Sequence, residues 1–166
     1  PMYSVSIAAR RVGEVIAGYV VNIATGEEWG AIAGSGSWRY DGNGLNLLAA
    51  PSVPRLDHAL VATGFNYVPE IRAKQAGAVA RLLPHIRDIR RIGSAALDLC
   101  ALAEGQYDAY VEEGLKQWDL AAGGLIASES GLIVSGLDGE PNERLVMVAH
   151  PSIAEEYFAL VRACGF

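Results

Sequence analysis

The stretch best suited to chemistry is residues 117–124, which read Gln-Trp-Asp-Leu-Ala-Ala-Gly-Gly. An aromatic residue, an acid and a run of very small residues predict the start of a helix, with the side chain of Asp119 as its N-cap. The small residues leave room for a close approach to the first turn. A carboxylate at this place is either a metal ligand or a plain helix cap, and this stretch alone leaves both interpretations open.

Two further stretches carry groups that can bind a ligand. Gly93 and Ser94 lie where a predicted strand passes into a predicted helix, and free N–H groups at a helix start bind anions or hydroxyls. Glu112 ends another predicted strand, seven residues before Asp119. A strand, a loop and a helix can bring both carboxylates to one crevice at the carboxyl edge of a sheet. The ordinary alternatives are a helix cap and a solvated strand end.

The elements that position these residues fall into two segments. Residues 1–50 read as antiparallel β structure, with alternating strands expected at 3–8, 14–23, 28–33, 37–40 and 45–49. The sequence Asp-Gly-Asn-Gly at 41–44 predicts a hairpin turn. Residues 51–57 contain two prolines and no clear periodicity, so we expect the boundary to an α/β lobe, residues 51–166, there.

The second segment alternates strand and helix patterns. Strands are expected at 59–64, 88–92, 107–112, 132–135 and 145–149, and helices at 69–83, 94–104 and 119–130. A last helix is expected to begin with a capping box, Ser-Ile-Ala-Glu at 152–155. This order predicts an α/β (α+β) fold in which antiparallel strands are followed by a mixed sheet flanked by helices.

Composition narrows the class of protein. The chain is 51% hydrophobic and 19% charged with a net charge of -6, which excludes disorder and argues against nucleic acid as the main ligand. Cys100 and Cys164 are expected to be buried or free thiols, which suits a reducing cytoplasm. No apolar run is long enough to span a membrane. The three tryptophans are interpreted as packing residues.

Three motifs together resemble the inositol monophosphatase family in order and spacing. They are Arg-Arg-Ile-Gly-Ser-Ala-Ala at 90–96, Tyr-Asp-Ala-Tyr-Val-Glu at 107–112 and Trp-Asp-Leu-Ala-Ala-Gly at 118–123. The resemblance covers nearly the whole chain, and the last motif is the most specific. It implies the C-terminal part of a layered α-β-α-β-α sugar-phosphatase sandwich, and a dimer.

The resemblance also implies an activity and a set of site residues. Members hydrolyse phosphate monoesters of small polyols, such as inositol monophosphate, with Mg²⁺. By matching position, Asp119 is implied as a metal ligand, and Glu112 as the acceptor of hydrogen bonds from substrate hydroxyls. The other implied substrate-binding residues are Gly93, Ser94, Ala95 and, at the pocket edge, Arg90.

One departure from the family pattern is large. The family's other metal-binding pieces, a glutamate and an Asp-Pro-x-Asp-Gly-Thr stretch, are not found in this sequence. We therefore expect a C-terminal portion of the enzyme that needs its N-terminal part and is inactive alone. Two alternatives stay open: another phosphatase of the superfamily, acting on nucleotide bisphosphate, fructose bisphosphate, histidinol phosphate or NADP, and a non-catalytic binding or dimerisation module.

Overall fold

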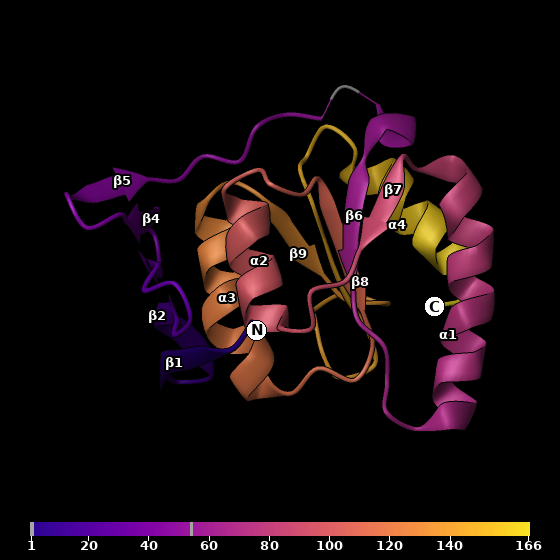
Figure 1. Ribbon diagram of the computed structural model, residues 1–166, viewed down its shortest axis with the longest axis horizontal. Helices are drawn as coiled ribbons and strands as arrows, with labels where there is room; N and C mark the ends of the chain where they lie inside the picture. The colour runs from indigo at the N-terminus through magenta and orange to yellow at the C-terminus, as the bar shows by residue number, and fades with distance from the viewer. Residues whose placement is uncertain (1, 54) are drawn as a thin grey trace.

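A computed structural model of the chain describes residues 2–53 and 55–166. Within these residues the chain forms two five-stranded sheets with helices between and beside them (Figure 1). Residue 1 of the predicted segment 1–50 and residue 54 of the predicted boundary 51–57 lie outside the described residues.

The first sheet is antiparallel throughout, as predicted. Its strands follow one another in chain order: β1 (Ser4–Arg11), β2 (Glu14–Asn22), β3 (Glu28–Ile32), β4 (Ser37–Tyr40) and β5 (Leu45–Leu47). The predicted turn at 41–44 joins the last two strands. There the side chain of Asp41 accepts hydrogen bonds from the backbone N–H groups of Asn43 and Gly44, 2.9 and 3.1 Å away.

The second sheet is mixed, which confirms the prediction. Its strands are β6 (Leu60–Thr63), β7 (Asp88–Arg90), β8 (Ala109–Glu112), β9 (Ile133–Ser135) and β10 (Val146–Ala149). They lie in the order β7-β6-β8-β10-β9. Strand β6 runs parallel to β7 and β8, whereas β10 runs antiparallel to β8 and β9. Strands β6 and β8 therefore end at the same edge of the sheet.

Four α-helices within the described residues complete the layers. They are α1 (Pro69–Leu82), α2 (Ala95–Ala103), α3 (Gln117–Glu129) and α4 (Ala154–Ala163). Helices α2 and α3 lie between the two sheets, while α1 and α4 cover the far face of the second sheet (Figure 1). Three clusters of buried apolar side chains fill the three interfaces between these layers. The division into two lobes remains a prediction, since α2 and α3 pack against both sheets.

The small residues at 121–124 serve the packing of α3 within the protein. A Cβ atom on Gly18 of β2 would lie 2.9 Å from the backbone of Ala122. A Cβ atom on Gly123 would lie 3.0 Å from the side chain of Leu99 in α2. The neighbours that approach this helix closely are thus β2 and α2.

Two predicted helix starts were wrong. Helix α3 begins at Gln117, so Asp119 is its third residue and accepts a 3.0 Å hydrogen bond from the backbone N–H of Lys116 instead of acting as N-cap. Helix α4 begins at Ala154 without a side-chain cap. The hydroxyl of Ser152 donates to the carbonyl of Val53 instead and accepts from its N–H, because this tertiary contact ties the segment after the first sheet to the last helix.

A carboxylate joins α3 to the first sheet across a long stretch of sequence. The two oxygens of Glu129 accept hydrogen bonds from the N–H groups of Gly34 and Gly36, each 2.8 Å long.

Both cysteines are buried and free, as predicted. Among the described helices, none is long and apolar enough to cross a membrane.

Candidate functional site

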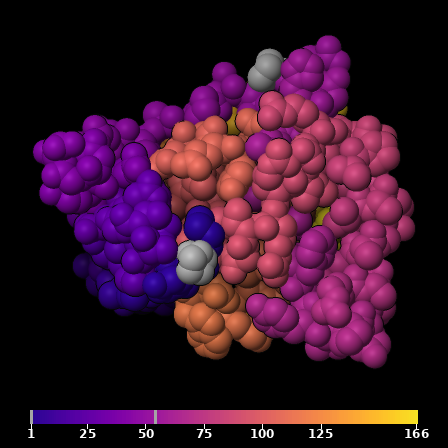
Figure 2. Space-filling view, viewed as in Figure 1, coloured from indigo at the N-terminus to yellow at the C-terminus, as the bar shows by residue number. Residues whose placement is uncertain are grey.

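A pocket of about 520 Å³ opens where β6 and β8 end and where α2 and α3 begin. Strand β1 borders it on the side of the first sheet, and Figure 2 shows that sheet, in indigo and purple, packed beside α2 and α3. The polar and small residues that face the pocket include Ser4, Ser6, Thr63, Gly64, Asn66, Arg91, Gly93, Ser94, Asp98, Glu112, Glu113 and Asp119.

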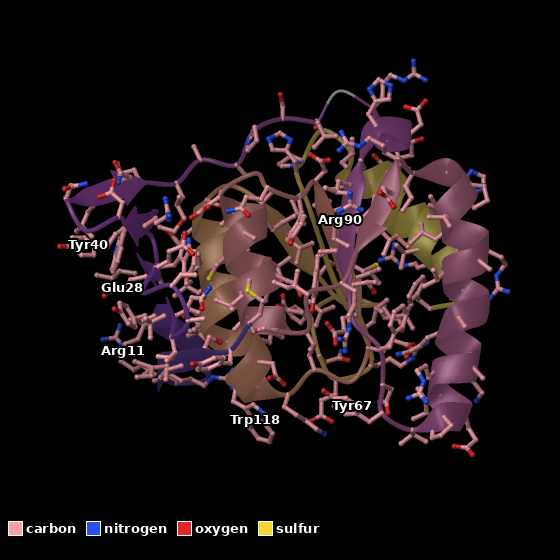
Figure 3. The ribbon with its side chains drawn as sticks, viewed as in Figure 1. Arg11, Glu28, Tyr40, Tyr67, Arg90 and Trp118 are labelled. Carbon is pink, nitrogen blue, oxygen red and sulfur yellow. The ribbon has the colours of Figure 1, made fainter. Side chains whose placement is uncertain are left out.

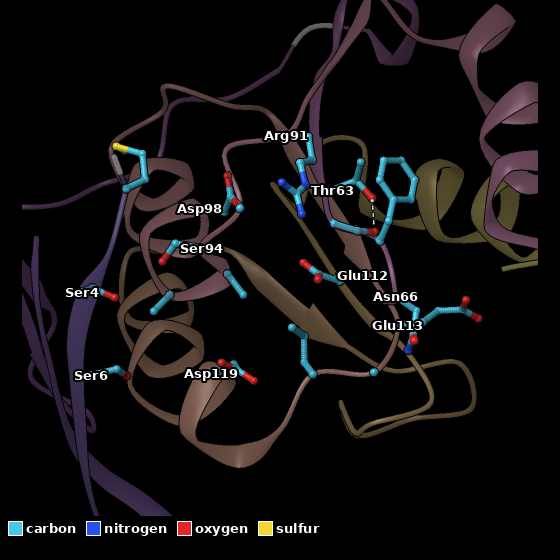
Figure 4. Close-up of a pocket in the computed structure, with 18 of the residues that line it drawn as sticks. Ser4, Ser6, Thr63, Asn66, Arg91, Ser94, Asp98, Glu112, Glu113 and Asp119 are labelled. Atoms are coloured by element: carbon cyan, nitrogen blue, oxygen red, sulfur yellow. Dashed lines mark hydrogen bonds between the residues drawn. The ribbon is translucent and has the colours of Figure 1, made fainter. Parts of the chain in front are cut away.

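The structure brings most of the predicted site residues to this one pocket. Glu112 is the last residue of β8, and Asp119 lies in the first turn of α3, after a short loop. Residues 93–95 enter from the start of α2. In Figure 4 the side chains of Glu112, Asp119 and Ser94 surround a common space. The crevice lies at the carboxyl edge of the sheet, as the sequence indicated.

Glu112 is held firmly at the inner wall of the pocket. Its carboxylate accepts a 2.5 Å hydrogen bond from the hydroxyl of Tyr110, which is itself fully buried. The same carboxylate packs directly on Gly64, where any Cβ atom would overlap it. Burial raises the pKa of Glu112, the Tyr110 hydrogen bond opposes that shift, and the charge of Asp119 adds to it.

Asp119 is oriented by its own helix. One of its oxygens accepts the Lys116 N–H, and among the described residues the other oxygen makes no hydrogen bond within the protein. The charge of Lys116 is paired with Glu143 at 2.6 Å, so this lysine does not neutralise Asp119. A carboxylate oxygen thus remains available to a ligand in the pocket.

The start of α2 offers backbone donors to the pocket. Gly93 has φ of +92°, a left-handed conformation that favours glycine, and this turn leads the chain into the helix. Ser94 occupies the N-cap position, but its side chain makes no capping hydrogen bond. The first N–H groups of a helix have no partner within it, so this end suits an anion or a hydroxyl.

The arginine at the pocket is not the one that the sequence indicated. Arg90 pairs with Asp88 at 2.5 Å and is exposed, and it does not line the pocket. Arg90 is the last residue of β7, and Figure 3 shows it near the middle of the view, with Trp118 at the lower edge of the molecule. Its neighbour Arg91 lines the pocket and makes no ion pair with any described residue. Successive residues of an extended chain point to opposite sides, so adjacent arginines face different surroundings.

Asp98 and Trp118 were missed by the sequence-based prediction. Asp98, only 1% exposed, lines the pocket from α2. The signal that could have revealed it is a single acid within the apolar stretch 95–103.

Trp118 was interpreted as a packing residue, which was wrong, because this residue is 71% exposed where it lines the pocket. Trp29 is buried, and Trp38 packs on Tyr19 and Gly30, as expected.

The donors in the pocket suit part of a Mg²⁺ site. Asp119 supplies the hard oxygen that Mg²⁺ prefers, and this ion is often held by one or two carboxylates together with water and substrate phosphate. Within residues 2–53 and 55–166, no group of three or more His, Cys, Asp or Glu residues is close enough to hold a metal ion. These residues therefore offer a partial ligand set.

Comparison with known proteins agrees with the geometry. The family model described as the inositol monophosphatase family matches residues 1–165. Inositol-1-monophosphatase SuhB of Mycobacterium tuberculosis is 42% identical over 164 residues, which cover 98% of this chain and 57% of that protein. The protein named Nus factor SuhB in Escherichia coli is 35% identical over 170 residues, covering 98% of this chain and 61% of its own length.

A solved structure extends the similarity to three dimensions. The structure of Mycobacterium tuberculosis SuhB superimposes with a TM-score of 0.92 at 42% identity, covering 99% of this chain and 66% of the other. The chain thus spans about six tenths of the length of these relatives. The matched length, the sequence identity and the shared layered fold together show that this chain belongs to the inositol monophosphatase family.

Proposed function

We propose that the protein is a Mg²⁺-dependent phosphatase that hydrolyses phosphate monoesters of small polyols such as inositol monophosphate. The observation that carries this proposal is the meeting of Glu112, Asp119 and the start of α2 around one pocket. Membership of the inositol monophosphatase family supports it, as does the name inositol-1-monophosphatase given to mycobacterial relatives.

Different residues of the pocket bind the polyol part and the phosphate part of the proposed substrate. Glu112, placed deep and oriented by Tyr110, accepts hydrogen bonds from the hydroxyl groups of the polyol. Gly93, Ser94 and Ala95 receive the phosphate or a hydroxyl at the N-terminus of α2. We assign no substrate contact to Arg90, whose charge is paired with Asp88.

Asp119 is the proposed metal ligand of this chain. When bound, Mg²⁺ would neutralise phosphoryl charge and lower the pKa of a coordinated water. The residues described here provide one predicted ligand, and the relatives are considerably longer. We therefore propose that this chain carries only the C-terminal part of the active site, and that the 166-residue chain alone is inactive.

Two measurements test this proposal. In the full-length protein, Asp119→Asn keeps an oxygen that can accept the Lys116 N–H, so the fold should survive while Mg²⁺-dependent turnover of inositol 1-phosphate falls at least about a hundredfold. Wild-type turnover in that variant would contradict the role of Asp119. Robust turnover by the 166-residue chain alone would contradict the partial site.

The remaining expectations concern partners and cellular setting. We propose a cytoplasmic homodimer, in keeping with the family resemblance and the two free thiols. The substrate class within the superfamily is open to test with a panel of inositol phosphates, fructose bisphosphate, histidinol phosphate and nucleotide phosphates. Glu112 favours the hydroxyl-rich members of that panel.

A second candidate is a non-catalytic binding module. Relatives named Nus factor SuhB, such as the Escherichia coli protein, favour it. Failure of the full-length protein to hydrolyse any compound of the panel, with Mg²⁺ present and the fold intact, would select this alternative.

A further inference from the structure

Asp98 is chemically unusual for its position in the fold. It lies within α2 among apolar residues and is 1% exposed. Neither of its two carboxyl oxygens has a hydrogen-bond partner among residues 2–53 and 55–166. An ionised carboxylate buried without a partner is strongly unfavourable, so the side chain must take up a proton or recruit a cation.

The groups that face Asp98 come from several elements. Arg91 precedes α2, Tyr110 and Glu112 lie on β8, and Tyr107 lies in the loop before that strand. Asp119 on α3 acts on Glu112 and Tyr110. In Figure 4 the guanidinium of Arg91 points into the space between the carboxyl groups of Asp98 and Glu112. The charge of Arg91 therefore acts on both Asp98 and Glu112, although its guanidinium forms a salt bridge with neither of these two residues.

Charge balance decides which acid keeps a proton. Burial, and secondly the charge of Glu112, raise the pKa of Asp98 to about 8, whereas Arg91 lowers it. Glu112 has the Tyr110 hydroxyl as a donor, which stabilises its ionised form. A neutral Asp98 beside ionised Glu112 and Arg91 gives the trio no net charge, and this arrangement spares the buried Asp98 side chain an unpaired charge.

We propose that Asp98 is a positioning residue whose protonated carboxyl leaves the guanidinium of Arg91 and the carboxylate of Glu112 available to the substrate. Asp98 lines the pocket, but its two carboxyl oxygens are enclosed by protein. It therefore acts through these two neighbours and does not touch the substrate itself. When Asp98 loses its proton, it attracts Arg91 away from the pocket and repels the charge of Glu112. The KM for the substrate should then rise, while kcat should change little because Asp98 does not contact the reacting atoms.

This inference rests on the proposed function, and kinetics of the full-length protein test it. With inositol 1-phosphate and Mg²⁺, the wild-type KM should rise roughly tenfold per pH unit above about pH 8, with a much smaller change in kcat. Asp98→Asn has the same shape and cannot ionise, so its KM should vary less than about threefold over that range. The exposed turn variant Asp138→Asn should follow the wild-type profile. A pH profile of Asp98→Asn that matches the wild type would overturn the proposal.

A second readout does not need activity. By NMR, the side-chain Nε–H resonance of Arg91 should shift with a midpoint near pH 8 in the wild type and should not shift in Asp98→Asn. An Arg91 resonance insensitive to pH in both proteins, or an Asp98 carboxyl that titrates in the ordinary range of aspartate, would refute the inference. If no phosphate monoester is hydrolysed, the proposed function fails, and the NMR experiment still decides the role of Asp98.

Discussion

At the scale of single residues, the contact between Gly64 and Glu112 defines the inner wall of the pocket. Gly64 follows β6 directly, and the carboxylate of Glu112 occupies the space that a side chain at position 64 would fill. The carboxylate lies at the end of a flexible side chain, so a larger residue at 64 would displace Glu112 and leave the backbone in place. This contact makes Gly64 a site residue although it has no side chain.

Gly64→Ala should therefore weaken substrate binding and leave the stability of the fold nearly unchanged. In the full-length protein we expect the KM for inositol 1-phosphate to rise about tenfold or more, because Glu112 loses its position, while the melting temperature changes little. Gly44→Ala is the matched control, since a Cβ atom at position 44 meets open space. An unchanged KM in Gly64→Ala would show that the position of Glu112 is unimportant for binding.

The buried acid in α2 also links stability to pH. The folded state retains the Asp98 proton up to about pH 8, whereas the unfolded chain loses it near the ordinary aspartate pKa of 3.8. Since the unfolded state binds fewer protons in that window, the free energy of unfolding should fall as pH rises from 4 to 8, by at most about 1.4 kcal/mol per unit. Above pH 8 this contribution no longer changes.

Asp98→Asn should remove that part of the pH dependence. Denaturant unfolding of the 166-residue chain at several pH values should show the variant gaining stability relative to the wild type as pH rises towards 8. Equal slopes for the two proteins would mean that Asp98 ionises normally in the folded state.

At the scale of elements, the packing of α3 against α2 and the first sheet sets the distance between the pocket residues. Helix α2 carries Asp98 and is preceded by its N-cap residue Ser94, and α3 carries Asp119, so the separation of the two helices fixes one dimension of the site. Gly123 lies at the contact, with the Leu99 side chain and the Ala96 carbonyl beside it. The helices can approach this closely only because position 123 has no side chain.

Gly123→Val should force the two helices apart. We expect the free energy of unfolding to fall by about 2 kcal/mol, the cost of overpacking a filled interface, even though valine has a better helix propensity than glycine. Gly77→Val in α1 is the matched control, because only the end of the Arg81 side chain lies near position 77. Equal stability of the two variants in urea would contradict close packing at position 123.

At the scale of the whole molecule, the outer face of the first sheet carries a row of mostly apolar side chains. Cross-strand pairing places Ile7, Tyr19, Gly30, Trp38 and Leu47 in one row across the sheet. The opposite face packs on α2 and α3. Among the described elements no helix covers the outer row, and Ile7 and Leu47 are 61% and 81% exposed.

The 166-residue chain should bind apolar dyes at this face. We expect a fluorescent apolar dye to bind the wild type, and the double variant Ile7→Lys with Leu47→Lys to lose most of that signal. Leu83→Lys changes an exposed leucine after α1 and should leave the signal intact. A dye signal unaffected by the double variant would locate the apolar surface elsewhere.

The order and type of the elements follow from local sequence. Strand alternation, the turn at 41–44 and the apolar period of the helices depend on residues close together in the chain, so both sheets and all four helices were predictable. The residues at which the helices begin were less predictable. Whether Ser152 caps α4 or binds Val53 depends on a tertiary contact. The start of α3 at Gln117 depends on a local hydrogen bond, from the backbone N–H of Lys116 to Asp119, whereas the small residues that follow had indicated Asp119 as the cap.

The sequence by itself determined the family motifs and, through them, the meeting of Glu112, Asp119 and the start of α2. Only the tertiary structure decided that Arg91 lines the pocket while Arg90 pairs with Asp88. The burial of Asp98 and its nearness to Glu112 were likewise settled by packing. The physical reason is the separation in sequence of the residues that interact. Turns and periodicity are set by neighbours in the chain, whereas burial and charge pairing are set by segments that meet only after folding.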